Sequence, residues 1–157
     1  MEKFGSLFAD VADTARIELL HPGTGKVLRD ADGTPAWIEV WPADSERGRT
    51  FDKAQRTKAA ESAAKGAEPE VLDLFDVTVA KCAKLTKAWH LLDLRGRPVD
   101  TACTPENALE LYSAPNPVSA SFYRQVAIGV GGAANFIKAS SESSSPSQSR
   151  NSELPGG

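Results

Sequence analysis

A six-residue segment, Ala36–Trp41, limits the possible folds of this chain more than any other. It holds two tryptophans, an isoleucine and a valine, and aromatic and β-branched side chains favour strands. Turn-forming residues precede it in Asp30–Pro35, and Pro42 ends it because proline has no amide hydrogen to donate to a sheet. A strand needs partners, so this segment commits the first part of the chain to a β-sheet.

Two further strands are predicted before this one. Ala15–Leu19 alternates apolar and charged residues, His21–Gly25 is typical of a turn, and Lys26–Leu28 is the expected returning strand. Together they predict a small antiparallel meander over residues 14–41. Three short strands are stable only when their apolar face is covered, so helices later in the chain must supply a second layer.

The first helix is expected to start after Asp44 or Ser45, either of which is a suitable N-cap, and to run from about Glu46 into Ala59–Ala64. Six basic and three acidic residues lie between Glu46 and Lys65. Few large apolar side chains follow Phe51, so we expect this helix to bury little of its surface.

A second helix, from Pro69 to about Ala88, is the predicted core helix because its apolar residues recur at steps of three or four. The members of this stripe are Val71 with Leu72, Phe75, Val79, Cys82, Leu85 and Trp89. The segment that follows, up to Val99, leaves this period and is expected to form a loop or a short hairpin that turns at Arg95–Gly96.

Two more helices complete the predicted helical part. Thr104 and Pro105 are typical of an N-cap and a first helical residue, and a last helix is expected after Pro117, from about Val118 to about Lys138. Gly129 and its neighbours Gly131 and Gly132 weaken that helix, which favours close packing of another helix against it over a bend.

The end of the chain has a different composition. Ser140–Gly157 contains eight serines and no aromatic or β-branched residue, so it cannot bury enough apolar surface to fold. We therefore predict an α+β fold with a single domain at 1–139, comprising the meander (14–41) and a mainly helical part (45–138), and a disordered tail at 140–157. The leader carries Phe4, Leu7, Phe8 and Val11 at helical spacing, which indicates a short helix or a docking segment.

Charge and composition exclude several classes of protein. The chain has 18 Lys and Arg against 21 Asp and Glu, a net charge of −3, and unspecific nucleic-acid binding needs clustered positive charge. No apolar run approaches the roughly 20 residues of a membrane span, and the N-terminus lacks a signal-peptide pattern, so a cytoplasmic protein is expected. Cys82 and Cys103 are expected to stay reduced there, without a disulfide or a cysteine-based metal site.

Two glycine-containing motifs resemble nucleotide-binding loops but lack essential parts. His21–Lys26 has no glycine five residues before its Gly-Lys pair, and Val27 stands where a phosphate-binding loop needs Ser or Thr. Gly129–Ala134 falls inside the last predicted helix with no strand before it. Both are interpreted as structural.

Catalytic arrangements are equally weak. The only histidines, His21 and His90, are expected in a turn and beside Trp89, without a recognisable nucleophile. Ser62–Lys65 has the spacing of some acyl-enzymes without their other motifs, and Asp73 with Asp76 complements a helix dipole. We therefore expect a non-enzymatic protein with no catalytic residues, no cofactor and no metal.

The aromatic residues suggest a binding surface instead. Trp37 and Trp41 fall on one face of their strand and Ile38 with Val40 on the other, so both faces are apolar. Either both tryptophans belong to the core, or one face is available to a partner. The basic residues of the adjoining helix supply a second candidate surface. The predicted partner-binding residues are Arg49, Lys53, Arg56, Trp37 and Trp41.

The order of these features resembles one known family. A glycine-turn hairpin leads through a strand to Asp44-Ser45 and a charged helix, and a core helix follows that ends at Trp89 with Asp93–Pro98 after it. The motifs Thr104–Ala108, Leu111-Tyr112 and Asn135-Phe136 complete the series. Over about Ala15 to Ala139, this series is similar to the tail assembly chaperones of long-tailed bacteriophages and related prophages.

The resemblance implies a protein without catalytic residues that binds the tape measure protein and tail tube subunits in the cytoplasm of the bacterial host. It also implies that the protein is absent from the finished virion. The alternative is a virion structural connector of the head-to-tail joint, and a small enzyme is a third reading. Self-association as a homo-oligomer stays open at this point.

Overall fold

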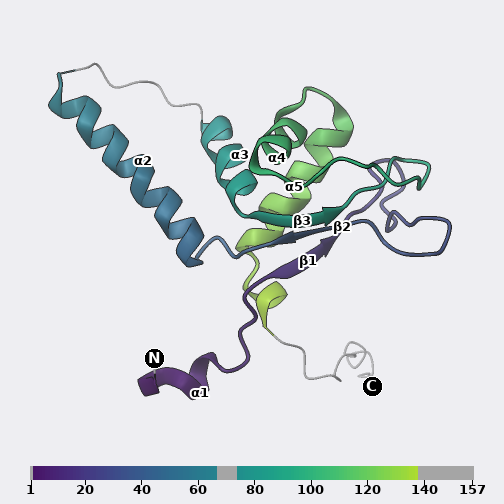
Figure 1. Cartoon of the computed structure of the whole chain (residues 1–157), viewed down its shortest axis with the longest axis horizontal. Coiled ribbons are helices and arrows are strands. Elements are labelled where there is room, and N and C mark those ends of the chain that lie inside the picture. Colours follow the sequence, from purple (N-terminus) through teal and green to yellow (C-terminus); the bar gives the residue numbers. More distant parts are fainter. Residues whose placement is uncertain (1, 67–73, 138–157) are drawn as a thin grey trace, which may run out of the picture.

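The structure, a computed structural model, describes residues 2–66 and 74–137 (Figure 1). Short helices η1 (Glu2–Phe4) and α1 (Gly5–Phe8) precede strands β1 (Ala15–Glu18) and β2 (Trp37–Val40). Helices α2 (Glu46–Ala64) and α3 (Leu74–Lys84) follow, and then strand β3 (Thr86–His90), helices α4 (Pro105–Ser113) and α5 (Pro117–Gly131), and η2 (Ala133–Phe136). One antiparallel sheet in the order β1-β2-β3, with α3, α4 and α5 on one side of it, confirms the α+β class.

Some sequence predictions lie outside the described residues. They are the disordered tail at 140–157, the end of the last helix at Lys138, and the start of the core helix at Pro69, with Val71, Leu72 and Asp73.

The third strand of the sheet is not the one predicted. Lys26–Leu28 makes only an isolated bridge between Leu20 and Val27, whereas β3 pairs with β2 from the second half of the chain. The meander prediction was therefore wrong in its third member. β2, the segment with the highest β-propensity, is the central strand and pairs with β1 along one edge and with β3 along the other.

The predicted core helix is correspondingly shorter, since α3 ends at Lys84. The Thr86 hydroxyl donates a hydrogen bond of 2.8 Å to the Cys82 carbonyl. If the helix continued, a backbone amide one turn later would donate to that carbonyl instead. The Tyr112 hydroxyl, 2.7 Å away, satisfies the same Thr86 oxygen in a buried setting. Placing Trp89 on the helical stripe was wrong, because Trp89 belongs to β3.

Phe75 was also misplaced by the predicted stripe. Its side chain is 50% exposed, and its ring meets the Tyr123 ring edge-on at a centroid distance of 5.3 Å. It lies at the margin of the core and is not one of its central residues.

The core lies between the inner face of the sheet and α3, α4 and α5. Ile38 and Val40 point into it from β2, and both are fully buried. The largest side chains that are almost completely buried are Tyr112, Leu19, Ile38, Leu85, Leu92, Val40, Val79 and Val126. They come from strands, loops and helices alike, so the two layers share one apolar cluster.

Helices α4 and α5 start where the sequence predicted. Thr104 Oγ1 accepts from the Asn107 amide at 3.0 Å, and Pro105 is the first residue of α4. The Asn116 side chain caps α5 in the same way through the Ser119 amide at 2.9 Å. Capping thus gives both helices a defined first turn.

The end of α5 differs from its prediction, because the helix stops at Gly131 and a short 3₁₀ turn follows. The close packing inferred at Gly129 is present, but a strand supplies it. A Cβ at Gly129 would lie 2.1 Å from Ile17 Cδ1 of β1. The missing side chain therefore lets α5 approach the sheet.

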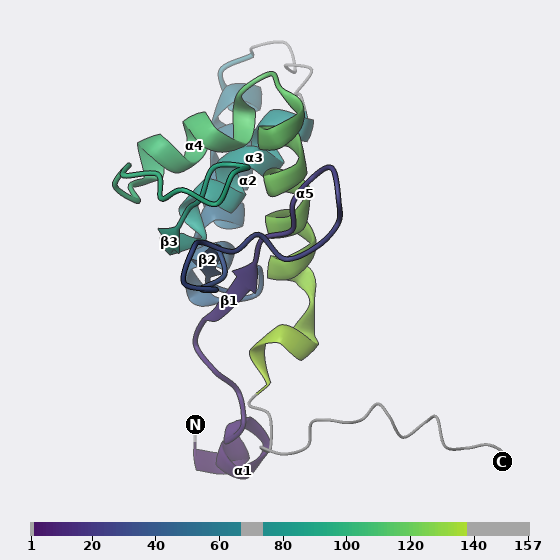
Figure 2. The same cartoon turned by 90° about the vertical axis from the view of Figure 1, so that its right-hand side faces the viewer.

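Two segments extend away from this body. In Figure 1, α2 projects to one side, with only Gly48 buried. Helix α1 lies below the sheet, and Figure 2 shows it apart from the sheet and from α2 in the perpendicular view. The expected short helix in the leader is present, and it has no buried residue.

Candidate partner-binding surface

The outer face of β2 carries the two tryptophans. Because side chains alternate along a strand, Ile38 and Val40 occupy the core and Trp37, Glu39 and Trp41 lie on the opposite side, where all three are partly buried. The shared face of Trp37 and Trp41 follows from the sequence. The structure adds that Trp37 lies on the side away from the core, whereas Trp41, directly after β2, also packs in part against the edge of the core cluster.

Each tryptophan on this face is stacked against an arginine. The Arg16 guanidinium lies 3.8 Å from the centroid of the Trp37 ring, and that of Arg47 lies 4.0 Å from Trp41. The Lys87 ammonium is farther from Trp41, at 5.9 Å. Such cation–π contacts contribute about 0.5–1 kcal/mol each at exposed sites. A binding partner can therefore replace the arginine on a tryptophan ring at a low cost in free energy.

Glu39 lies between the two tryptophans in sequence and is the acidic residue of this face. Thr14 donates a hydrogen bond of 2.6 Å to its carboxylate, and Arg16 Nε and Lys87 Nζ lie 3.9 and 4.0 Å from its oxygens. Arg16 is opposite Glu39 in the sheet register. One carboxylate thus has two cationic neighbours, and the face is organised as alternating aromatic and charged groups.

At its α2 end, this face continues into a groove of about 740 Å³. We call it the Trp41 groove, and its lining residues are Asp13, Trp41, Ser45, Glu46, Arg47, Thr50, Phe51, Ala54 and Lys84. Trp41, Phe51 and Ala54 supply apolar surface, and Arg47 with Lys84 supplies positive charge. An apolar floor with charges at its border suits an amphipathic peptide.

The predicted basic residues of α2 lie elsewhere on that helix. Arg49, Lys53 and Arg56 are all exposed, and they share one face because they are spaced by four and three residues. At about 100° per residue, that face is rotated by about 200° from the face of Arg47. The structure therefore brings Trp41 together with Arg47 and does not bring it together with the predicted trio.

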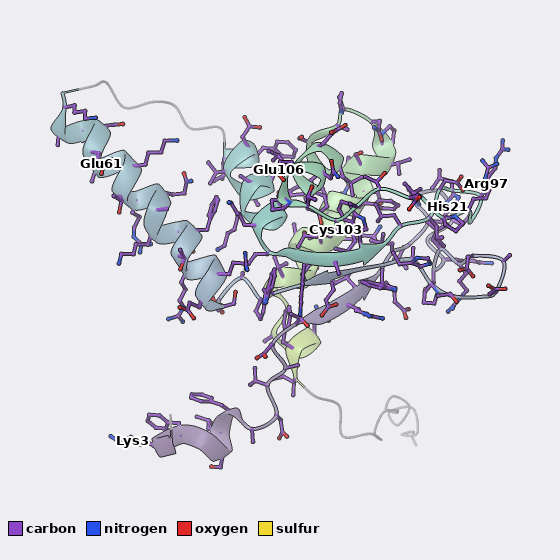
Figure 3. The ribbon with its side chains drawn as sticks, viewed as in Figure 1. Lys3, His21, Glu61, Arg97, Cys103 and Glu106 are labelled. Atoms are coloured by element: carbon purple, nitrogen blue, oxygen red, sulfur yellow. The ribbon has the colours of Figure 1, made fainter. Side chains whose placement is uncertain are left out.

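Arg49 and Lys53 border a separate shallow depression of about 410 Å³. Its other lining residues are Asp44, Glu46 and Thr50. Beyond it α2 is exposed on all sides from Arg56 onward, and Figure 3 shows Glu61 on this projecting part, well away from the sheet. The helix thus presents one face to the groove and a different, basic face to solvent.

The sequence reading missed Arg16, Glu39, Arg47, Phe51 and Lys84 as members of this surface. Arg16 and Glu39 were not brought together by it, because the predicted meander placed Lys26–Leu28 between their two strands, whereas β1 and β2 pair directly. Arg47 and Phe51 were seen only as parts of a charged helix. Lys84 had no signal, since its position depends on how α3 packs beside the sheet.

The residues with possible chemical reactivity lie away from the groove. His21 Nδ1 accepts hydrogen bonds from the Gly23 and Thr24 amides, at 2.9 and 3.3 Å, and so closes its own turn. In Figure 3, His21 and Arg97 lie at the end of the molecule opposite Glu61. His90 Nε2 is 3.7 Å from Asp30 Oδ2, and amides of the Asp30 turn, chiefly that of Thr34, lower the pKa of the Asp30 carboxyl.

The cysteines have different surroundings. Cys82 is buried, and burial raises the pKa of its thiol to about 11. Cys103 is less buried, and the same cause raises its pKa. A thiol with a raised pKa is a poor nucleophile at neutral pH because little thiolate is present.

Over residues 2–66 and 74–137, no group of three or more His, Cys, Asp or Glu side chains is arranged to hold a metal ion. Within the same residues, every helix is too short or too polar to cross a bilayer.

Comparisons with protein-family models, with curated proteins and with solved structures gave no match to this chain.

Proposed function

We propose that this protein is a non-enzymatic tail assembly chaperone, which holds an amphipathic helical segment of the tape measure protein in the Trp41 groove. The observation that carries the proposal is the groove itself. It joins an arginine-stacked tryptophan to one face of a helix that is otherwise largely exposed. The order of sequence motifs shared with phage tail chaperones supports the choice of partner.

The chemistry of the groove matches a helix with one apolar stripe. Trp41 and Phe51 offer flat apolar surface, and large aromatic side chains commonly dominate binding energy at interfaces. Arg47 and Lys84 offer partners for carboxylates beside the stripe, and Asp13 and Glu46 offer partners for basic groups. The apolar stripe gives the affinity, and the charges at the border set orientation and association rate.

The basic face of α2 has a secondary role in this proposal. Arg49, Lys53 and Arg56 attract acidic parts of the partner without contacting its apolar stripe. Their effect is on the rate of encounter, which falls as ionic strength rises. Tail tube subunits are proposed as a second partner on the strength of the resemblance, and the host cytoplasm is the proposed location.

The proposal is tested by co-expressing the tagged full chain with the tape measure protein of the same tail gene cluster and recovering the complex. Arg47→Glu combined with Ala54→Glu places negative charge in the groove and should lower partner recovery about tenfold or more, a loss typical of a disrupted binding centre. The matched control reverses Arg49, Lys53 and Arg56 together. It should cost less affinity, mainly through slower association.

Equal recovery with both folded variants and the wild type would overturn the groove as the binding site. Whether the protein is a chaperone or a virion component has a separate test, which is mass spectrometry of purified phage particles. A chaperone should be absent from them, and stoichiometric presence would instead support a structural connector of the virion.

A further inference from the structure

The N-terminal arm, residues 3–13, exposes a stripe of apolar side chains that residues 2–66 and 74–137 leave largely uncovered. The exposed fractions of Phe4, Leu7, Phe8 and Val11 are 48%, 71%, 48% and 44%. The four side chains follow helical spacing, and the Phe4 and Phe8 rings are 6.2 Å apart. Contiguous apolar surface of this kind on a folded protein marks a site of association.

Two backbone contacts hold the base of the arm. The Ala12 amide donates to the Phe136 carbonyl at 2.7 Å, and Val11 forms an antiparallel bridge with Ile137. Figures 1 and 2 both show α1 apart from α2 and the sheet. Of the arm, only Asp13 lines the Trp41 groove of its own chain, so the apolar stripe lies outside that groove.

We infer that the Trp41 groove takes the N-terminal arm of a second copy of this chain, and that reciprocal exchange of arms makes a two-fold dimer. The apolar stripe of the arm meets Trp41 and Phe51. The groove lining carries both signs of charge, Arg47 and Lys84 beside Asp13 and Glu46, and the arm exposes one group of each sign, Asp10 and Lys3. This inference describes the chain without its partner and does not depend on the identity of the partner proposed above; a partner segment that enters the same groove displaces the arm.

The position of Asp13 explains why the exchange can close. This residue ends the arm and also lines the Trp41 groove of its own chain, so the base of each arm lies at the border of a groove. When two copies face each other, each arm starts at the border of its own groove and enters the groove of the other copy. The same pair of surfaces is then used twice, which limits the assembly to a closed dimer.

The first experiment measures self-association of the full chain alone by sedimentation equilibrium. Leu7→Glu on the arm and Ala54→Glu in the groove should each weaken the dimer by about tenfold or more. Ala60→Glu is the matched control, because Ala60 is exposed on the same helix but does not line the groove. It should leave the dimer constant unchanged.

A monomer at all concentrations would overturn the inference. So would a dimer that Leu7→Glu weakens and Ala54→Glu does not, which would indicate direct pairing of two arms. Equal weakening by Ala60→Glu would show that net charge, and not the groove, controls association.

A crosslinking experiment separates exchange from binding within one chain. Leu7→Cys and Ala54→Cys are combined in a chain that also carries Cys103→Ser, and a short bismaleimide is added. Exchange predicts a covalent dimer that neither cysteine gives alone. A crosslink confined to the monomer would show that the arm occupies its own groove and would overturn the dimer.

Discussion

Helices α2 and α5 are both well formed, yet they are held in place by different interactions. α2 has 19 residues, of which only Gly48 is buried. α5 has 15 residues and buries Phe122, Tyr123, Val126 and Val130 together with Ser119 and Gly129. Each starts with a side-chain cap, from Ser45 in one case and Asn116 in the other. A capped and helix-favouring sequence is thus enough to form a helix, whereas an apolar stripe is needed to bury it.

The attachment of α2 to the body is correspondingly local. Gly48 lies so close to the preceding turn that a Cβ there would be 2.1 Å from the Ala43 carbonyl oxygen. Farther along, Lys81 of α3 forms a 3.0 Å ion pair with Asp52. From Arg56 onward every side chain of α2 is exposed. This helix can therefore be altered over most of its length without disturbing the core.

The contrast between α2 and α5 predicts the largest loss of stability when a buried apolar side chain of α5 is shortened. Phe122→Ala removes a side chain that is 4% exposed and should lower the free energy of unfolding by about 3–5 kcal/mol. Lys58→Ala, on exposed α2, should change it by less than about 0.5 kcal/mol. Urea denaturation followed by circular dichroism measures both. Similar effects of the two changes would contradict the contrast between the helices.

Gly129 is predicted to give the next largest effect. Gly129→Ala forces Ile17 to move from its position on β1 and should destabilise the fold by about 1–3 kcal/mol. Gly131→Ala is the control, because no atom lies within 4 Å of a Cβ at that position. It should be neutral or slightly stabilising, since alanine favours the helix. A Gly129→Ala variant as stable as its control would show that α5 and β1 pack less closely than described.

A smaller and local effect is expected for the cap of α2. Ser45→Ala removes the oxygen that accepts from the Gly48 amide at 3.2 Å and should cost the helix about 1 kcal/mol. Amide hydrogen exchange within α2 should become faster, while the urea midpoint of the whole protein changes little. Ser62→Ala, within the exposed part of the same helix, is the matched control. If Ser45→Ala lowers the midpoint as strongly as Phe122→Ala, α2 and the core unfold together.

The smallest effect concerns thiol reactivity beneath α2. Cys82 lines a space of about 350 Å³ between α2, α3 and α5. With a pKa of about 11, its thiolate fraction at pH 9 is about 1%, and it rises as pH increases toward the pKa. Alkylation should therefore modify Cys103 first, and Cys82 only slowly. Peptide mass spectrometry after timed labelling measures both sites, and faster labelling of Cys82 would show that α2 separates from the body.

Local signals in the sequence predicted many of the elements correctly. Ser45, Thr104 and Asn116 occupy positions where a side chain caps a helix, and the first two were identified as candidate caps from sequence. The alternation along Ala36–Trp41 correctly divided Trp37 and Trp41 from Ile38 and Val40. These features depend on residues close together in the chain, so a sequence pattern contains all the information they require.

The candidate surface was less predictable. Trp37 and Trp41 were selected because a strand that is apolar on both sides is unusual, and the structure places both on the outer face. Arg49, Lys53 and Arg56 were selected by charge alone. Charge does not specify which side of a helix meets the sheet, and Arg47 is the residue that stacks on Trp41.

The sequence by itself determined the starts of α2, α4 and α5, the turns and the two faces of β2, because caps, glycines and alternation act over a few residues. Only the tertiary structure decided that Thr86–His90 is a strand. Its apolar residues fit the end of a helical stripe equally well, and β2 had a free edge that a distant segment could fill. The Trp41 groove arises in the same way, since Trp41, Phe51 and Lys84 meet only when β2, α2 and α3 pack together. Pairing between distant segments depends on which surfaces remain uncovered after local structure forms, and no single stretch of sequence encodes that.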